Sequence, residues 1–269
     1  MFYIPSPHPF HRCFRTDKFR FLDLKVADAY TNMAVDEALA QARGEGRSPD
    51  TLRFYMWKPS AVTLGYFQSV EDEVNLDALK EYGIYLNRRI SGGGAVLNSA
   101  TGEITYSVIM DEKDPRVSSD PVESYRYLCH GIVEALAILG IKADFKPIND
   151  IVVGAKKISG NAQIRRYGAV LHHGTLLVDY SAREMFSVLK ISKEKLSDKM
   201  IQQAEERVTT IRRELGRQIS FDEVRDAFEE GYRRALKAEL VPGYLTPYET
   251  DLVEKFRERY ASREWIYRR

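Results

Sequence analysis

Two glycine-bearing segments constrain this chain more than any other part of its sequence. Residues 88–96 read RRISGGGAV, and residues 149–162 read NDIVVGAKKISGNA. Three successive glycines let backbone N–H groups converge on one concave site without obstruction by Cβ atoms. A lysine pair flanked by glycines can place one ammonium group against an anion held there. Together the two segments predict an enzyme site that handles a nucleotide phosphate.

The glycine run is weak evidence when it is taken alone. It matches neither the GxGxxG fingerprint of dinucleotide-binding folds nor the GxxxxGK[ST] loop of P-loop proteins. A tight turn between strands, with glycines needed only for packing, is the alternative. In the ligand-binding interpretation, Arg88 or Arg89 supplies a fork of donors to phosphate oxygens.

Lys156 and Lys157 are adjacent in a predicted strand, so their side chains point to opposite faces. One lysine can therefore enter a site while the other stays in solvent. A lysine beside an α-phosphate neutralises charge as the transition state forms, and such electrostatic stabilisation is often the largest catalytic contribution. The alternative is that both lysines are solvated charges of an edge strand.

Three other positions carry groups suited to binding or catalysis. Asn149-Asp150 offers a carboxylate to Mg²⁺-nucleotide or to an incoming amine, or else forms an ordinary turn. The adjacent rings of His172 and His173 diverge, so we expect one buried histidine and one near the pocket. Cys129 lies within a predicted helix, where buried packing is expected rather than nucleophilic reactivity.

Composition limits the remaining possibilities. The chain has 269 residues, 44% of them hydrophobic, which suits one large domain with a sizeable core. Its 40 basic and 39 acidic residues give no global charge that favours nucleic acid. The two cysteines form no disulfide or zinc pattern, and no apolar run is long enough for a membrane span. We expect a cytoplasmic protein that binds neither nucleic acid nor membrane.

Hydrophobic periodicity predicts an α+β fold, with mixed or antiparallel sheets and flanking helices, rather than a doubly wound parallel sheet. Residues 1–20 are expected to form an N-terminal extension and residues 21–269 one catalytic domain, of which 193–269 is mainly helical. Strands are predicted at 19–24, 51–57, 61–67, 103–110, 143–145, 150–153, 156–163 and 169–179. Helices are predicted at 28–42, 76–82, 121–139, 181–189, 221–238 and 246–260.

Three segments resemble the lipoate–protein ligase A family in residue identity, order and spacing: RRISGGGAV, NDIVVGAKKISGNAQ and LHHGTLLVDY. The resemblance extends from residue 20 to residue 265. It implies the class II synthetase-like fold that this family shares with biotin ligases and octanoyltransferases. It also implies a two-step reaction: lipoate and MgATP give lipoyl-adenylate and pyrophosphate, and a lysine of a lipoyl-domain protein then takes the lipoyl group and releases AMP.

The resemblance also implies roles for particular residues. Lys157 is expected to be the catalytic lysine, because it matches the family lysine that meets the lipoyl carbonyl and the phosphate. Nucleotide contacts are implied for Arg89, Gly92, Gly93, Gly94, Ala95, Val96, Leu97, Asn149, Asp150 and Lys157, with Asp150 also beside the Mg²⁺ of ATP. Lipoate contacts are implied for Gly65, Gly93, Lys157, Ser159, Gly160 and His173.

The chain departs from the family in two places. Asn98-Ser99 stand where many relatives have His-Asp, and we expect no small accessory domain after Trp265. The second departure resembles archaeal ligases in which that domain is a separate subunit, so we expect such a partner. The acceptors implied are acyltransferase subunits of 2-oxoacid dehydrogenases, a glycine-cleavage carrier or similar lipoyl-domain proteins.

Three alternatives accompany the ligase hypothesis. A lipoyl or octanoyl transferase of the same fold holds its acyl group on a cysteine, and residues 144–150 and 160–176 contain none. A biotin ligase normally has further arginines among the glycines. A non-catalytic lipoate carrier is disfavoured by the intact segment around Lys157. The ATP-dependent ligase is therefore the leading expectation.

Overall fold

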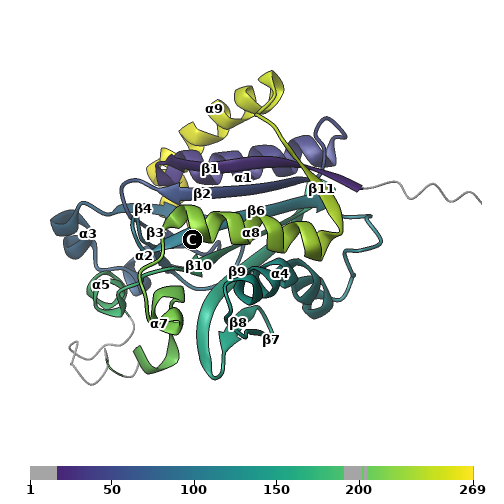
Figure 1. The fold of residues 1–269 in the computed structure, drawn as a ribbon. Helices are drawn as coiled ribbons and strands as arrows, with labels where there is room; N and C mark the ends of the chain where they lie inside the picture. Colours follow the sequence, from purple (N-terminus) through teal and green to yellow (C-terminus); the bar gives the residue numbers. More distant parts are fainter. Residues whose placement is uncertain (1–16, 191–201, 203–204, 269) are drawn as a thin grey trace, which may run out of the picture.

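The computed structural model describes residues 17–190, 202 and 205–268 (Figure 1). The strands are β1 (Asp17–Ala27), β2 (Thr51–Trp57), β3 (Ala61–Leu64), β4 (Tyr85–Arg88), β5 (Val96–Asn98), β6 (Glu103–Asp111), β7 (Asp144–Lys146), β8 (Asp150–Val153), β9 (Lys156–Arg166), β10 (Ala169–Leu177) and β11 (Ala238–Pro242). The helices are α1 (Ala29–Gly44), α2 (Val70–Glu73), α3 (Leu76–Tyr82), α4 (Pro121–Ile138), α5 (Ala182–Val188), α7 (Ile211–Leu215), α8 (Phe221–Leu236), α9 (Pro247–Ala261) and α10 (Arg263–Ile266).

The strands form two sheets. The large sheet has the order β11-β1-β2-β6-β10-β9-β8-β7, and the small sheet has the order β4-β3-β5. In the large sheet β11, β1 and β2 pair in parallel, whereas the strands from β2 to β7 pair antiparallel. This mixed pairing confirms the α+β class and rules out a doubly wound parallel sheet.

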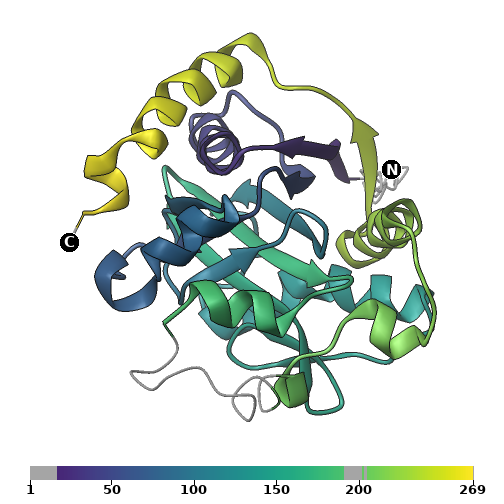
Figure 2. The same ribbon diagram turned by 90° about the vertical axis from the view of Figure 1, so that its left-hand side faces the viewer.

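Each face of the large sheet packs against its own helices, because alternate residues of a strand point to opposite faces. On one face Phe54, Tyr106 and Val170 belong to a core that includes α4 and α8. On the other face Tyr55, Trp57 and Leu171 pack with residues of α1 and α9. Figure 2 shows these helix pairs around the strands. The small sheet forms a third core with α3 and α5.

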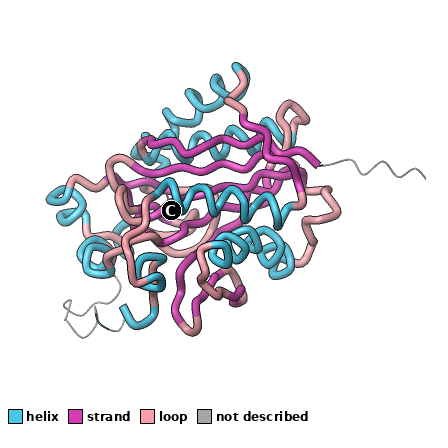
Figure 3. Tube along the Cα trace, in the orientation of Figure 1, coloured by secondary structure: helices cyan, strands magenta, loops and turns pink. Residues whose placement is uncertain are grey.

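Several short elements were not predicted. Sequence periodicity missed α2, β4, β5, α7, β11 and α10, of which β11 lies inside the part expected to be mainly helical (Figure 3). It pairs in parallel with β1, from Asp17↔Ala238 to Phe21↔Pro242. Because β1 begins at Asp17, residues 17–20 belong to the sheet and not to an extension. Residues 1–16 lie outside the described part of the chain.

Helices α4 and α8 approach each other closely at two glycines. A Cβ atom on Gly231 would lie 2.5 Å from the backbone nitrogen of Ala135, and one on Gly131 would lie 2.5 Å from the ring of Tyr232. Real side chains do not tolerate such distances, so glycine is needed here in spite of its low helix propensity.

Gly231→Ala should lower the stability of the fold. Alanine improves helix propensity by about 1 kcal/mol, but overpacking a well-packed contact costs roughly 1–3 kcal/mol. We expect the melting temperature to fall by several degrees. Glu254→Ala, on an exposed position of α9, serves as the control and should leave it unchanged. A more stable Gly231→Ala protein would contradict this close packing.

Candidate functional site

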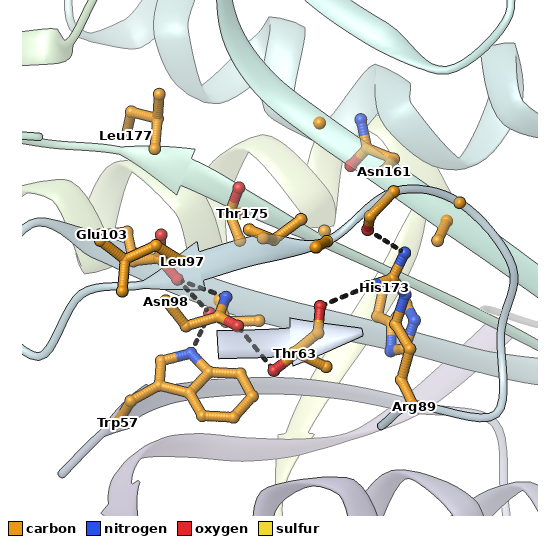
Figure 4. Close-up of a pocket in the computed structure, with 18 of the residues that line it drawn as sticks. Trp57, Thr63, Arg89, Leu97, Asn98, Glu103, Asn161, His173, Thr175 and Leu177 are labelled. Carbon is orange, nitrogen blue, oxygen red and sulfur yellow. Dashed lines mark hydrogen bonds between the residues drawn. The ribbon is translucent and has the colours of Figure 1, made fainter. Parts of the chain in front are cut away.

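A pocket lies between the large sheet and the small sheet (Figure 4). Its volume is about 370 Å³, within the range of small-molecule sites. The large sheet supplies Tyr55 and Trp57 from β2, Glu103 and Thr105 from β6, His173, Thr175 and Leu177 from β10, and Gly160 and Ala162 from β9. These are alternate residues of neighbouring strands, so they share one face. The glycine segment and β5 form the opposite wall.

Most of the predicted site residues meet at this pocket. Its lining includes Arg89, Gly93, Gly94, Ala95, Val96, Leu97, Asn149, Lys157, Gly160 and His173. The structure therefore brings together the two segments that the sequence singled out. Four predicted residues, namely Gly65, Gly92, Asp150 and Ser159, do not line it.

Each of these four residues has a different position. Ser159 pairs with Leu176, which belongs to the core on the α4 side of the sheet, so Ser159 lies on the face turned away from the pocket, and its lipoate contact stays a prediction. Gly65 permits a close approach of two loops, because a Cβ there would lie 2.0 Å from the carbonyl oxygen of Gly93. Gly92 offers its carbonyl to Arg89. Asp150 faces Lys157 rather than the pocket wall.

Lys157 and Asp150 form an ion pair beside the pocket. Lys157 Nζ lies 2.6 Å from Asp150 Oδ1, and both side chains are partly exposed. A Cβ atom on Gly160 would lie 2.8 Å from Lys157 Nζ, so glycine at this position leaves room for the ammonium group. Lys156 is exposed. The two lysines thus differ as predicted, with Lys157 at the pocket.

Asn149 and Asn161 hold the segment before Asp150 against β9. Asn149 Nδ2 donates to the carbonyl of Asn161 at 2.5 Å, and Asn161 Nδ2 donates to the carbonyl of Asn149 at 2.9 Å. Asn161 Oδ1 accepts from the Tyr106 hydroxyl, which also contacts His172 Nε2. Burial lowers the pKa of His172 to about 3, so this ring is neutral. His172 is the buried histidine that was expected.

The buried Arg89 side chain holds the glycine segment by hydrogen bonds to its backbone. Its guanidinium donates to the carbonyls of Thr63, Gly92 and Gly94 and to the Ser91 hydroxyl. Burial lowers its pKa to about 10, which leaves it charged at neutral pH. The expected free fork of donors for phosphate is therefore occupied by the loop's own oxygens.

Arg88, the other arginine considered for phosphate, is fully buried and has a structural position. It donates to the carbonyls of Gly65, Tyr66, Gln68 and Ile266. These contacts join β4 to the loop after β3 and to α10. The expectation that Arg88 serves phosphate binding is not supported, because its donors face backbone oxygens.

A buried carboxylate that sequence reasoning missed supports the same loop. Asp36 accepts hydrogen bonds from Arg53 (2.6 Å), Ser107 (2.7 Å) and Tyr55 (3.0 Å), and its Oδ2 lies 3.0 Å from His173 Nδ1. Burial acts to raise the pKa of Asp36, but the charge of Arg53 and the hydrogen bonds of His173 and Ser107 outweigh it and lower the pKa. Asp36 is therefore ionised.

His173 connects this carboxylate to the glycine segment. Because Nδ1 donates to ionised Asp36, Nε2 is left to accept from the Ser91 hydroxyl at 2.6 Å. Ser91 Oγ in turn accepts from Arg89 Nε at 3.1 Å. These distances are those of a serine–histidine–aspartate triad, but Ser91 is fully buried and does not line the pocket. The chain of contacts positions the loop and offers no accessible nucleophile.

A second missed carboxyl group, Glu103, lies at the other end of the pocket from Arg89 (Figure 4). Its Oε1 accepts from Asn98 Nδ2 at 2.9 Å and from Thr105 Oγ1 at 3.2 Å. Oε2 is buried and has no hydrogen-bond partner among the described residues. Burial raises the pKa of Glu103 to about 8, although the hydrogen bonds of Asn98 and Thr105 oppose this. The group is mainly protonated at neutral pH.

Cys129 cannot reach this pocket from its place in α4. It is fully buried, its Sγ lies 3.7 Å from His172 Nε2, and burial raises the pKa of its thiol above the usual range. Such a thiol is poorly nucleophilic. Cys13 lies outside the described residues, so the pocket as described has no thiol in its wall.

Within residues 17–190 and 205–268 no group of three or more His, Cys, Asp or Glu side chains could hold a metal ion. The Asp150 carboxylate, which was expected near Mg²⁺, is paired with Lys157. In the same described part of the chain, no helix has the length and apolar character that crossing a bilayer requires.

The raised pKa of Glu103 should make stability depend on pH. Its usual pKa is 4.5 and its folded value is about 8. The unfolded chain therefore loses this proton first, and stability falls as pH rises between these values, by on the order of 4 kcal/mol at pH 8. Glu103→Gln has no titratable group at this position. The melting temperature of the variant minus that of wild type should therefore increase steadily from pH 4.5 to pH 8. Tyr180, the titratable neighbour, has a raised pKa and stays neutral throughout. A difference that does not change with pH would contradict the assignment.

Comparison with known proteins identifies the family. The model of the lipoyl protein ligase A/B catalytic domain matches residues 28–233. Octanoyltransferase LipM of Brevibacillus brevis is 34% identical over 277 residues, covering 94% of this chain and 100% of the relative. The Bacillus subtilis LipM is 32% identical, covering 94% of this chain and 99% of the relative.

Solved structures agree. The bi-partite lipoate protein ligase of Thermoplasma acidophilum superposes with a TM-score of 0.82 at 31% identity, covering 93% of this chain and 96% of that one. A lipoate-protein ligase A bound with ATP gives a TM-score of 0.79 at 31% identity, with coverages of 92% and 98%. The fold implied by the motif resemblance is thereby confirmed, and the chain belongs to the lipoyl protein ligase A/B catalytic domain family of enzymes.

Proposed function

We propose that this chain transfers an octanoyl or lipoyl group to the lysine amine of a lipoyl-domain protein. The observation that carries the proposal is the Lys157 ammonium, which is held by Asp150 beside a pocket walled by the glycine segment. An acyl carbonyl placed next to this ammonium gains stabilisation as negative charge develops on its oxygen. The apolar side chains of Trp57, Leu97 and Leu177 suit the alkyl chain of the acyl group.

Asp150 has a role that follows from its contact with Lys157. A carboxylate 2.6 Å from the ammonium limits the orientation of that lysine. The paired amides of Asn149 and Asn161 fix the segment that carries Asp150. An incoming lysine amine must lose a proton during acyl transfer, and Asp150 is the carboxylate next to the proposed reaction centre.

The relatives support octanoyl transfer as the first candidate. Relatives that match nearly the whole chain at 32–36% identity include octanoyltransferases. The expectation of an ATP-dependent ligase has less support from these relatives than the transferase alternative. In this first candidate, the acceptor amine attacks an octanoyl thioester, an amide bond forms and the thiol leaves.

A specific observation favours ATP-dependent ligation as a second candidate. The pocket wall contains no cysteine among the described residues, so a route through a thioester on the enzyme has no nucleophile there. In ligation the acyl carboxylate attacks the α-phosphate of ATP, giving an acyl-adenylate and pyrophosphate. The acceptor amine then takes the acyl group and releases AMP. The two matched solved structures are lipoate ligases, one of them bi-partite. A separate accessory subunit therefore belongs to this candidate.

The residues fit MgATP in part. Lys157 offers a cation, and residues 93–95 offer glycine-rich backbone on the facing wall. Asp150 is the acidic group that pairs with Lys157, so Mg²⁺ would rest mainly on phosphate oxygens and water, as it commonly does with nucleotides.

The two candidate functions use different acyl donors, so the donor requirement distinguishes them. The full chain is incubated with a lipoyl-domain acceptor and either an octanoyl thioester of acyl carrier protein or lipoate with MgATP, and acceptor mass is followed. Acylation by the thioester without nucleotide supports transfer. Acylation that requires ATP and releases AMP supports ligation, and the reaction is repeated with an accessory subunit present. No acylation in any arm would overturn the proposed function.

Lys157→Ala should reduce acyl transfer by at least roughly a hundredfold, on the scale of losing one transition-state donor. Lys156→Ala is the matched control, because this neighbouring lysine is exposed, and its rate should stay close to that of wild type. The measurement is the acylation rate with whichever donor is active. Equal losses in both variants would contradict the assignment of the reaction to the face of β9 that carries Lys157.

A further inference from the structure

A row of three residues crosses the α4 side of the large sheet and ends next to the proposed reaction centre. Tyr106 of β6 pairs with Gly174 of β10, and Gly174 pairs with Asn161 of β9. A Cβ atom on Gly174 would lie 1.9 Å from Asn161 Oδ1, so glycine in the middle strand leaves the space that the outer two side chains need. Across this space the Tyr106 hydroxyl reaches Asn161 Oδ1 at 2.6 Å.

The direction of each hydrogen bond follows from the far end of this row. Asn161 Nδ2 donates to the carbonyl of Asn149 at 2.9 Å, so the amide atom that faces Tyr106 is the oxygen. An amide oxygen can only accept, and the Tyr106 hydroxyl therefore directs its one proton there. His172 Nε2 lies 2.7 Å from the same hydroxyl oxygen. It must carry the ring proton and donate it to Tyr106.

The environment of His172 keeps this donor in place. The ring is fully buried, and burial lowers its pKa to about 3, so it stays neutral with one proton. Its Nδ1 has no hydrogen-bond partner among the described residues. Nε2 also lies 3.7 Å from Cys129 Sγ, but its short contact is the one with Tyr106. A fixed donor behind the hydroxyl leaves the Tyr106 proton directed at Asn161.

The same row determines where Asp150 lies. Asn149 and Asn161 are joined by three hydrogen bonds, two from their side chains and one from the Asn161 backbone N–H to the Asn149 carbonyl at 3.2 Å. Asp150 follows directly and begins β8, next to the edge of the sheet, where the register with β9 shifts after Ile151. The contacts of Asn161 therefore add a constraint that the irregular strand pairing lacks.

We propose that Tyr106 is a positioning residue, whose hydroxyl fixes the Asn161 amide and thereby holds Asp150 opposite Lys157. The inference rests on the proposed function, because it takes the Lys157–Asp150 pair as the reaction centre. Tyr106 is fully buried and does not line the pocket, so it acts through Asn161 and not on the substrate.

Such a role predicts a particular kinetic pattern. The apolar side chains proposed to bind the acyl group lie on the other face of the sheet, and they make no contact with this row. Loss of the hydroxyl should therefore slow the transfer step and leave binding of the acyl donor nearly unchanged. A residue that only stabilises the fold would show no such division between kcat and KM.

Tyr106→Phe tests this inference, because it removes the hydroxyl and keeps the ring. Tyr260→Phe is the matched control, since Tyr260 is also fully buried and donates to Glu37 at 2.6 Å, remote from Asn161. Acylation of a lipoyl-domain acceptor is followed with whichever donor is active. We expect kcat of Tyr106→Phe to fall about tenfold with KM for the donor within about twofold of wild type. Tyr260→Phe should keep the wild-type kcat even where its melting temperature falls. In an Asn161→Ala background Tyr106→Phe should add little further loss.

Hydrogen–deuterium exchange supplies a second readout that does not depend on activity. Amides of residues 147–153 should exchange faster in Tyr106→Phe than in wild type, and at the wild-type rate in Tyr260→Phe. Unchanged exchange in this segment, a wild-type kcat in Tyr106→Phe, or equal effects of the two substitutions would overturn the inference. A wild-type chain that transfers no acyl group from any donor would instead count against the proposed function, and the exchange rates would still decide whether Tyr106 positions Asp150.

Discussion

The ionised carboxylate of Asp36 is the interaction on which the geometry of this site depends. It lies on α1 and joins Arg53 and Tyr55 of β2, Ser107 of β6 and His173 of β10. Removing one partner of such a buried pair commonly costs about 3–5 kcal/mol, because the other charge is left uncompensated. Through His173 and Ser91 the same network reaches Arg89, whose guanidinium holds the glycine segment. One buried charge thus fixes both the helix on the sheet and the loop at the pocket.

The pocket is built from two kinds of polar group. Lys157 and Asp150 are partly exposed charges at one end of it. Glu103 is a neutral acid enclosed at the other end, surrounded by fixed donors and apolar side chains. The charges at one end suit the proposed bond formation at a carbonyl.

Sequence reasoning succeeded where several residues share a pattern. The strand at 51–57 and the helix at 76–82 were predicted with the observed bounds, because alternation and capping signals are local. The glycine and lysine segments were placed together because each is long and specific. Asp36 and Glu103 were missed because single acidic residues are usually exposed, and nothing in their local sequence pairs them with a basic group. The one available signal was the position of Asp36 among the apolar residues of α1, which indicates burial. The short strand β11 was missed because its pairing with β1 is set by tertiary contact, not by its own residues.

Ser91→Ala tests most directly whether the buried network sets the loop opposite Lys157. The substitution removes the hydroxyl between His173 and Arg89 but leaves the Asp36–Arg53 ion pair intact. The measurement is kcat/KM for acyl transfer to a lipoyl domain, alongside the melting temperature. We predict a fall of about tenfold to a hundredfold, the scale of a small misplacement of a site wall, with little loss of stability. A Ser91→Ala enzyme with the wild-type rate would contradict the account.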